Sequence, residues 1–251
     1  MEENTTFLDS VKSLQLIVTK SKKIVFFGGA GVSTESGIPD FRSMDGLYNQ
    51  EWKYPPEQII SRSFFYSNTK EFYRFYRAKL LPKGIKPNAA HYKLAEMEQK
   101  GKLLAVVTQN IDGLHQMAGS KTVYELHGST LRNYCMDCHA FYDEKIIEES
   151  ENAPDKLPHC PKCGGLIKPD VVLYEEGLDQ RTIENAVNAI ASADTLIIGG
   201  TSLVVYPAAG LIDYFHGDNL ILINKSATSR DNLANLVIHD SIGKVLGALE
   251  I

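Results

Sequence analysis

The sequence predicts an α/β fold in which a doubly wound parallel sheet carries an inserted, smaller zinc-binding and helical part. Short apolar runs alternate with segments of helical periodicity, a pattern typical of parallel strands that are buried on both faces. The first of these runs ends in a cluster of glycines, and all four cysteines fall in one stretch as two close pairs. A chain of 251 residues is long enough for one large domain and a small companion.

Composition is that of a soluble globular protein, with 43% apolar and 23% charged residues. The formal net charge of −5 and the lack of long basic runs argue against direct nucleic-acid binding. No apolar run approaches the roughly 20 residues that cross a bilayer, so we expect no membrane association. Residues 1–4 lack the features of a signal peptide, and close cysteine pairs favour metal over disulfides. We therefore expect a cytoplasmic protein.

The first elements follow from the apolar pattern. Apolar residues at roughly helical spacing predict a helix over residues 5–20. Residues 23–27 form an apolar, β-rich run, and the glycines after it predict a tight turn into a helix N-terminus. Such a turn offers N–H groups to a phosphate, although Thr34 stands where the third glycine of the fingerprint G-x-G-x-x-G belongs. We interpret residues 43–48 as a mobile loop.

The remaining elements alternate in the same way. The aromatic-rich segment 55–81 predicts short helices packed by their rings, and Asn88 and Gly101 bound the helix that follows. A cysteine-bearing insert occupies residues 131–168. The other predicted strands cover residues 103–108, 122–126, 195–198 and 220–223, and the other predicted helices cover 179–192, 205–215 and 241–249.

Polar or glycine-rich residues follow each predicted strand. They lie at residues 28–31, 109–112, 127–128, 199–202 and 224–226. In a parallel sheet, ligands bind beyond the carboxyl ends of the strands. We therefore expect these five strand tips to meet at one edge of the sheet and to form a ligand-binding rim.

The cysteines form a C-x₂-C…C-x₂-C pattern with 21 residues between the pairs: Cys135, Cys138, Cys160 and Cys163. Each pair sets two thiolates on one side of a turn, and two pairs close a tetrahedron around Zn²⁺. Four sulfur ligands leave no open position for water, so the pattern predicts a structural zinc. His139 and His159 flank the cysteines and are expected to stay outside the metal shell.

His127 ends a predicted buried strand and precedes Gly128. A lone histidine there is more often a structural hydrogen-bonding group than a catalyst. The same rim, however, carries Asn110 and Asp112, and an imidazole is the side chain best suited to proton transfer near neutral pH. We therefore favour a catalytic role for His127, and we expect the other histidines, among them His91 and His115, to be structural.

Two further groups on the rim have two interpretations each. Thr201 and Ser202 follow a glycine and either form a second phosphate-binding turn at a helix start or simply cap that helix. Asn224 either binds a ribose hydroxyl or terminates its strand.

Together these motifs resemble the signature of the sirtuins of bacterial type, which are NAD-dependent protein-lysine deacylases. The motifs occur in the family's order at residues 29–33, 37–42, 109–112, 127–128, the four cysteines, 171–172 and 200–202. The resemblance implies a Rossmann-type NAD-binding domain made of residues 1–42, 88–130 and 169–251. It also implies a small domain that combines a helical module, residues 43–87, with a zinc ribbon, residues 131–168.

The resemblance further implies a deacetylase that consumes NAD and releases nicotinamide, O-acetyl-ADP-ribose and free lysine. His127 would be the general base that activates a ribose hydroxyl, and Asn110 would orient the ribose and a water molecule. The other residues that the resemblance assigns to NAD binding are Ala30, Thr34, Phe41, Arg42, Gln109, Ile111, Asp112, Thr201, Ser202, Asn224, Lys225 and Ile242.

The resemblance also implies which residues bind the substrate. Val171 and Val172 resemble the segment that binds an acyl-lysine peptide as an added strand. The family more often has Phe-Gly-Glu where this chain has Tyr-Glu-Glu at residues 174–176. Relatives that prefer acidic acyl groups carry a Tyr-x-x-Arg pair, whereas this chain has Tyr73 and Tyr76. We therefore expect acetyl or another neutral acyl group, carried by acetylated protein or peptide substrates.

Two other functions use the same residues differently. One is mono-ADP-ribosylation of a protein on the same scaffold. The other is a non-enzymatic module that senses NAD and carries a zinc ribbon. Substitution of His127 separates the sensor from the deacetylase, because a sensor keeps its function without that imidazole.

Overall fold

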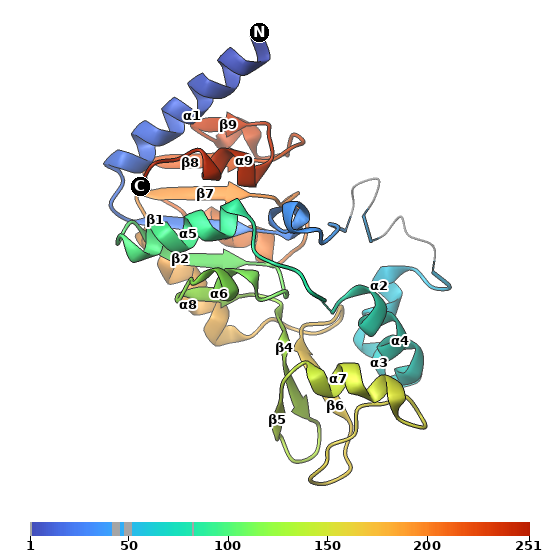
Figure 1. Ribbon diagram of the computed structural model, residues 1–251. Coiled ribbons are helices and arrows are strands. Elements are labelled where there is room, and N and C mark those ends of the chain that lie inside the picture. Colours follow the sequence, from blue (N-terminus) through green and yellow to red (C-terminus); the bar gives the residue numbers. More distant parts are fainter. Residues whose placement is uncertain (1, 42–45, 48–51, 82) are drawn as a thin grey trace.

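The computed structural model describes residues 2–41, 46–47, 52–81 and 83–251, with residues 2–6 described by their backbone alone (Figure 1). A six-stranded sheet has the order β3-β2-β1-β7-β8-β9, and all its neighbouring strands are parallel. This order confirms the predicted doubly wound fold, because the strand sequence runs outward in both directions from β1. The strands are β1 (Ile24–Gly28), β2 (Leu103–Thr108), β3 (Val123–Glu125), β7 (Thr195–Gly199), β8 (Asn219–Ile223) and β9 (Leu236–Ile238).

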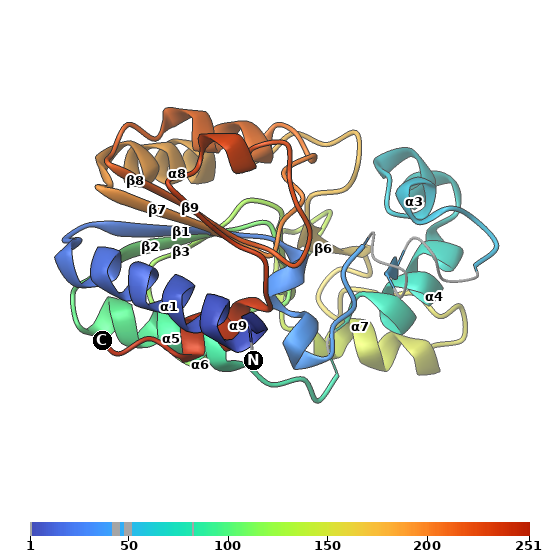
Figure 2. The same ribbon diagram turned by 90° about the horizontal axis from the view of Figure 1, so that it is seen from above.

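Helices cover both faces of the large sheet (Figure 2). On one face, α1 (Glu2–Lys20), α5 (Ala89–Gln99) and α9 (Ile242–Gly247) bury apolar side chains against alternate strand residues such as Phe26. On the other face, α8 (Gln180–Ser192) and the 3₁₀ helix η5 (Ala208–Tyr214) pack against the strand residues between them, such as Phe27. The fully buried patterns of β1 and β7 explain their uninterrupted apolar sequences.

The helix between Asn88 and Gly101 is confirmed as α5. The Asn88 side chain accepts a hydrogen bond from the N–H of Ala90 at 3.0 Å, and Gly101 adopts a φ of +71° beyond the helix end. Leu94 and Met97 are fully buried on its inner side. Two short elements lie elsewhere between strands of the large sheet: α6 (Leu114–Ala118) between β2 and β3, and the 3₁₀ turn η6 (Asp231–Leu233) between β8 and β9.

Two predictions about local structure are wrong, and one strand of the large sheet has no counterpart among the predictions. The glycine turn after β1 leads into two 3₁₀ turns, η1 (Ala30–Val32) and η2 (Thr34–Ser36), because the left-handed Gly37 ends the helical path at once. The predicted helix 205–215 is the 3₁₀ helix η5, which follows Pro207 and contains a glycine. Strand β9 lies where no strand was predicted, since three residues are too few to show a period.

A second unit, here called the small module, contains a three-stranded antiparallel sheet of order β5-β4-β6. The aromatic rings of its helices, among them Phe65 and Tyr73, share one core with Cys135, Cys160 and Ile167 of its cysteine-bearing part. The short ring-packed helices are thereby confirmed. The elements are α2 (Pro56–Ile59), α3 (Arg62–Ser67), α4 (Thr69–Lys79), β4 (Gly128–Cys135), β5 (Phe141–Tyr142), α7 (Lys145–Glu149), η4 (Ser150–Asn152) and β6 (Ile167–Val171).

In the described part of the chain, no helix combines the length and the apolar character needed to span a membrane. Arg42 and most of the predicted loop 43–48 lie outside the described residues.

Candidate active site

The rim lies where the strand order reverses, between β1 and β7. The N–H of Gly31 donates to the carbonyl oxygen of Gly200 at 2.8 Å, so the two glycine turns touch. A Cβ atom on Gly31 would lie 2.8 Å from that oxygen, and one on Gly200 would lie 2.3 Å from the nitrogen of Val32. Only glycine permits this approach, which leaves backbone exposed to a ligand at the switch point of the sheet.

Side chains from three strand tips are hydrogen-bonded across the rim. The amide of Gln109, after β2, donates to Thr201 Oγ1 at 3.1 Å, after β7. Asn224, after β8, accepts from the N–H of Thr201 and donates to its carbonyl oxygen, both at 3.0 Å. The convergence of tips that lie over a hundred residues apart in sequence is therefore confirmed. Thr201 does not begin a helix, because η5 starts only at Ala208.

His127 adjoins the same rim. Its Nδ1 lies 2.9 Å from the carbonyl oxygen of Gln109, which can only accept, so Nδ1 carries the proton of the neutral ring. Nε2 is then unprotonated and free to act as a base. Burial lowers the pKa of His127, and the hydrogen bond to Gln109 opposes that shift. The imidazole is consequently neutral at pH 7.

A relay of polar side chains starts at Asn110, the residue after Gln109. The Asn110 amide donates to Ser33 Oγ at 3.1 Å, and Ser33 donates in turn to Asp112 Oδ2 at 2.6 Å. Burial raises the pKa of Asp112, while hydrogen bonds from Ser33 and the N–H of Leu114 oppose the shift. All three side chains of the relay are buried. Ser33 was not predicted as a site residue, although its hydroxyl stands inside the glycine-rich motif.

The other predicted site residues occupy varied positions. Thr34 Oγ1 donates to the carbonyl oxygen of Gly31 at 2.9 Å, which tightens the first glycine turn. Ile242 is buried in the core, where its Cδ1 occupies the space that a Cβ on Gly199 would need. Half-buried positions are held by Ala30, Phe41 and Ile111, and exposed ones by Ser202 and Lys225.

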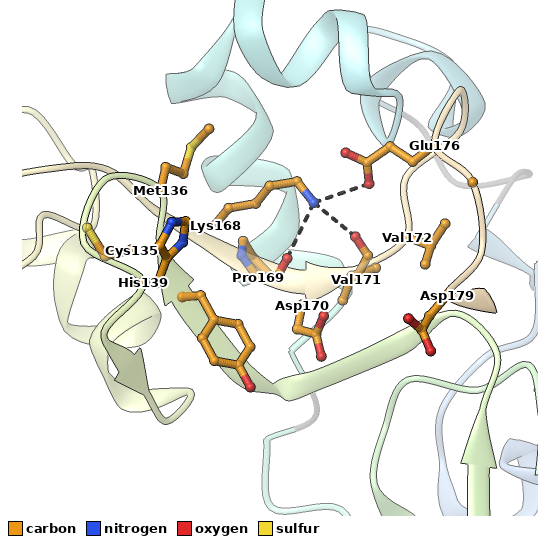
Figure 3. A pocket seen from close by; sticks show the side chains of 12 residues that line it. Cys135, Met136, His139, Lys168, Pro169, Asp170, Val171, Val172, Glu176 and Asp179 are labelled. Carbon is orange, nitrogen blue, oxygen red and sulfur yellow. Dashed lines mark hydrogen bonds and ion pairs between the residues drawn. The ribbon is translucent and has the colours of Figure 1, made fainter. Parts of the chain in front are cut away.

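Val171 and Val172 lie at the end of β6, next to the backbone of His127 and Gly128. The N–H of Val172 donates to the carbonyl oxygen of His127 at 3.0 Å, and Val171 pairs with Gly128 in the antiparallel ladder. Val172 also lines a pocket of about 370 Å³ on the outer face of the small sheet. Figure 3 shows Lys168 in that pocket, with its amino group directed at Glu176 and at the Pro169 and Val171 carbonyl oxygens.

The four cysteine sulfurs lie within 4.8 Å of one another. Cys135 Sγ is 3.4 Å from Cys163 Sγ, and Cys138 Sγ is 3.6 Å from Cys160 Sγ. Both distances are far too long for a disulfide and close to the roughly 3.8 Å between two ligands of a tetrahedral Zn²⁺ site with 2.3 Å bonds. The cysteines are therefore positioned to bind a structural zinc. His159 instead contacts Asp155 at 2.7 Å, outside this cluster.

Arg132 on β4 joins the two sheets. Its guanidinium contacts Glu125 of β3 at 2.5 Å and Asp170 of β6 at 2.8 Å. Glu125 precedes His127 by two residues, and Asp170 precedes Val172 by two. The side chain of Glu125 is 7% exposed, so its carboxylate depends on this cation.

We expect Arg132→Ala to lower the free energy of unfolding by about 2 kcal/mol, because it leaves a buried carboxylate without its cation. The loss stays below the 3–5 kcal/mol typical of fully buried pairs because the Arg132 side chain is 37% exposed. Urea unfolding followed by circular dichroism measures the change. Lys12→Ala, which breaks the exposed pair with Asp9, is the matched control and should change stability by less than about 0.5 kcal/mol.

Two buried histidines lie on α5 and α6. The rings of His91 and His115 are 4.7 Å apart, and His115 also contacts Phe26. Neither ring nitrogen of His115 has a hydrogen-bond partner among the described residues, nor does Nε2 of His91. Burial lowers the pKa of His91 to about 4 and that of His115 well below its usual value. Both rings are neutral core groups, as expected from the sequence.

These histidines should make the protein acid-sensitive. Below about pH 6.5 these histidines bind protons in the unfolded chain but not in the folded chain. The free energy of unfolding therefore falls as the pH drops toward 4. His91 alone should lower the free energy of unfolding by about 2–3 kcal/mol between pH 7 and pH 4.5. Urea unfolding at both pH values tests this. His115→Phe should shrink the difference between them, and an unchanged difference would contradict this account.

The Sir2 family model matches residues 29–207. A Clostridium perfringens protein named NAD-dependent protein deacetylase is 64% identical over 242 residues, which cover 95% of this chain and 98% of the relative. A Staphylococcus aureus protein of the same name is 48% identical over 243 residues, covering 96% and 98%.

Solved structures agree over nearly the whole chain. A Sir2 complex with a p53 peptide and NAD⁺ gives a TM-score of 0.83 at 39% identity, covering 94% of this chain and 95% of the other. Sir2 bound to an acetylated peptide gives a TM-score of 0.84 at 38% identity with the same coverage. The match extends through the large sheet, the rim and the cysteine cluster alike, and the chain therefore belongs to the Sir2 family, the sirtuins.

Proposed function

We propose that this protein is an NAD-dependent protein-lysine deacetylase, which transfers an acetyl group from lysine to ADP-ribose and releases nicotinamide. One observation carries the proposal: His127, hydrogen-bonded to Gln109 of the rim, has an unprotonated Nε2, while its own carbonyl oxygen accepts from the N–H of Val172. A base is thus fixed between a dinucleotide-type crevice and a segment suited to an extended peptide. The curated relatives carry the same activity in their names.

In this proposal the acyl oxygen of the substrate attacks the nicotinamide ribose, and nicotinamide leaves. His127 Nε2 then accepts the proton of a ribose hydroxyl, which becomes the nucleophile of the following step. Asn110, held by Ser33, orients the ribose and a water molecule, and Gln109 hydrogen-bonds the ribose. The neutral imidazole supports this role, because a protonated ring could not take up that proton.

NAD binding is assigned to residues around the crevice. Ile111, Asp112 and Phe41 are proposed to line the nicotinamide pocket, and Ala30, Thr34 and Arg42 to face the pyrophosphate. The adenosine half is assigned to Thr201, Ser202, Asn224, Lys225 and Ile242. Support differs among them: Thr201 and Asn224 are hydrogen-bonded at the rim, whereas the Ile242 side chain is buried in the core beneath it.

Two tyrosines support a neutral acyl group. Tyr73 and Tyr76 are fully buried in the core of the small module, and the Tyr73 hydroxyl hydrogen-bonds the carbonyl oxygen of Ile167. Burial raises the pKa of both hydroxyls, so neither carries charge near neutral pH. A tyrosine in place of arginine offers no cation to an acidic acyl group. We propose acetylated lysine in proteins or peptides as the substrate.

The domain assignment remains part of the proposal. Residues 1–42, 88–130 and 169–251 would bind NAD, and 43–87 with 131–168 would form the small domain, whose zinc is structural. We also propose that the protein acts in the cytoplasm, where a tetrathiolate zinc site is compatible with reducing conditions.

The test is nicotinamide release from the zinc-loaded protein with an acetyl-lysine peptide. Release should require both NAD and the acetyl group, and it should yield O-acetyl-ADP-ribose in equal amount. Label from NAD that stays covalently on the peptide would indicate ADP-ribosylation instead. Absence of release with folded, zinc-loaded protein would reject the deacetylase. A panel of succinyl, acetyl and longer neutral acyl peptides then tests the acyl preference.

A further inference from the structure

The segment after β6 contains an unusual backbone conformation. Glu175 has a φ of +74°, in the left-handed region that glycine adopts without cost and other residues rarely enter. A side chain held there needs compensating contacts from its surroundings. This position lies three residues after Val172, at the end of the segment proposed to bind the substrate peptide.

The compensation comes from the helical part of the small module. The two carboxylate oxygens of Glu175 accept different hydrogen bonds from one residue: the N–H of Ser63 donates to Oε2, and the Ser63 hydroxyl donates to Oε1, both at 2.9 Å. Ser63 lies more than a hundred residues earlier in the chain, at the start of α3. A carboxylate strengthens both bonds relative to a neutral acceptor.

Backbone hydrogen bonds accompany this contact. The N–H of Arg62 donates to the carbonyl oxygen of Tyr174 at 2.9 Å, and the N–H of Tyr174 donates to that of Ile60 at 3.0 Å. Ser61 and Tyr174 form a parallel bridge between the two segments. We call these four hydrogen bonds, two from Ser63 and two of the backbone, the clasp.

The opposite end of the segment is attached to His127. The N–H of Val172 donates to the carbonyl oxygen of His127, and Val171 pairs with Gly128. Between the two ends, the N–H of Leu173 donates to Glu176 Oε2 at 2.9 Å, and the same oxygen accepts from Lys168, as Figure 3 shows. The segment 171–175 therefore spans from the proposed base to the helical part of the small module, with hydrogen bonds at both ends.

We propose that Glu175 is a positioning residue for substrate binding: through Ser63 it locks the clasp and so fixes the segment 171–174 on which the acyl-lysine peptide is bound. The inference rests on the proposed function. When a peptide binds as an added strand, the receiving segment must be ordered. If that segment is already fixed, less conformational entropy is lost on binding. The clasp therefore sets the affinity for the peptide and leaves the NAD side of the crevice unaffected, since the rim contacts of Gln109, Thr201 and Asn224 belong to the large sheet.

The test compares steady-state constants for the peptide and for NAD. Glu175→Ala should raise the KM for an acetyl-lysine peptide about tenfold, with kcat and the KM for NAD within about twofold of the unaltered protein. Glu175→Gln keeps one acceptor oxygen without the charge and should raise the peptide KM less than the alanine variant does. Glu175→Gly should behave like the alanine variant, although it removes the backbone strain. Glu184→Ala, an exposed carboxylate on α8, is the control and should change neither constant.

A double-mutant cycle with Ser63 completes the test. Ser63→Ala should raise the peptide KM by itself and should add little to Glu175→Ala, because both substitutions break the same contact. Full additivity, an unchanged peptide KM in Glu175→Ala, or equal increases in both KM values would overturn the proposal. Recovery of the normal KM in Glu175→Gly would do so as well, since strain rather than the contact would then be responsible.

The clasp can also be tested without turnover. Amide hydrogen exchange at Arg62, Ser63 and Tyr174 should speed up at least about tenfold in Glu175→Ala and stay unchanged in Glu184→Ala. An unaltered protein that releases no nicotinamide would reject the proposed deacetylase, while exchange would still decide whether Glu175 holds the clasp. Unchanged exchange with a normal peptide KM would reject the clasp and leave the deacetylase intact.

Discussion

His127→Ala is expected to lower the kcat for NAD-dependent deacetylation by about 10²–10⁴-fold, the range for loss of a general base. The ring offers a basic Nε2 at the crevice, because its Nδ1 donates to the carbonyl oxygen of Gln109. The Kd for NAD, measured by calorimetry, should stay within about threefold. The smaller side chain leaves the rim contacts of Gln109, Thr201 and Asn224 in place.

The pH profile gives an independent check on the same residue. Burial lowers the pKa of His127, so the base stays unprotonated to a lower pH than a free histidine does. The acidic limb of kcat/KM should therefore have its midpoint below about pH 6.5. His216→Ala, an exposed histidine, serves as the control and should keep full activity. Normal turnover in His127→Ala would rule out the base.

Removal of the zinc is expected to unfold the small module. Cys135 and Cys160 are almost fully buried in the core that holds Phe65 and Tyr73, so their thiolates would face each other there without a metal. Structural zinc contributes about 10–16 kcal/mol to small metal-dependent folds, which exceeds the stability of most domains. A chelator, or Cys160→Ser, should abolish the near-ultraviolet signal of the buried aromatic rings and the binding of acetyl peptide.

His159→Ala provides the matched control. His159 lies next to Cys160 but contacts Asp155 and the carbonyl oxygen of Gly164, so this variant should retain one zinc per chain by metal analysis. Retention of the folded small module after complete zinc removal would show that its aromatic core suffices alone.

Much of this molecule follows from local sequence pattern. The strands of the large sheet are apolar without interruption because both faces are covered, and their polar tips identify the rim before any tertiary contact is known. The cysteine spacing likewise determines the metal centre. His127 could be predicted as catalytic only because Asn110 and Asp112 lie on the same rim. A histidine at the end of a strand is by itself little evidence of catalysis.

The features that escaped prediction depend on tertiary contacts. Ser33 joins Asn110 to Asp112 only once β1 and β2 are adjacent, and Arg132 gains its partners from two other strands. Glu175 at positive φ contradicts its local preference and is explained only by Ser63, far away in sequence. Apart from Ser33, which stands inside the glycine-rich motif, no periodicity or spacing marks these positions, because their partners come from other elements.

The two outermost strands of the large sheet, β3 and β9, are only three residues long. An unpaired strand border is a template on which another chain can add and begin to aggregate. Because each border presents so few open backbone groups, the long apolar strands at the centre are shielded from intermolecular pairing. A highly β-prone sheet can in this way remain dispersed at high concentration once it has folded.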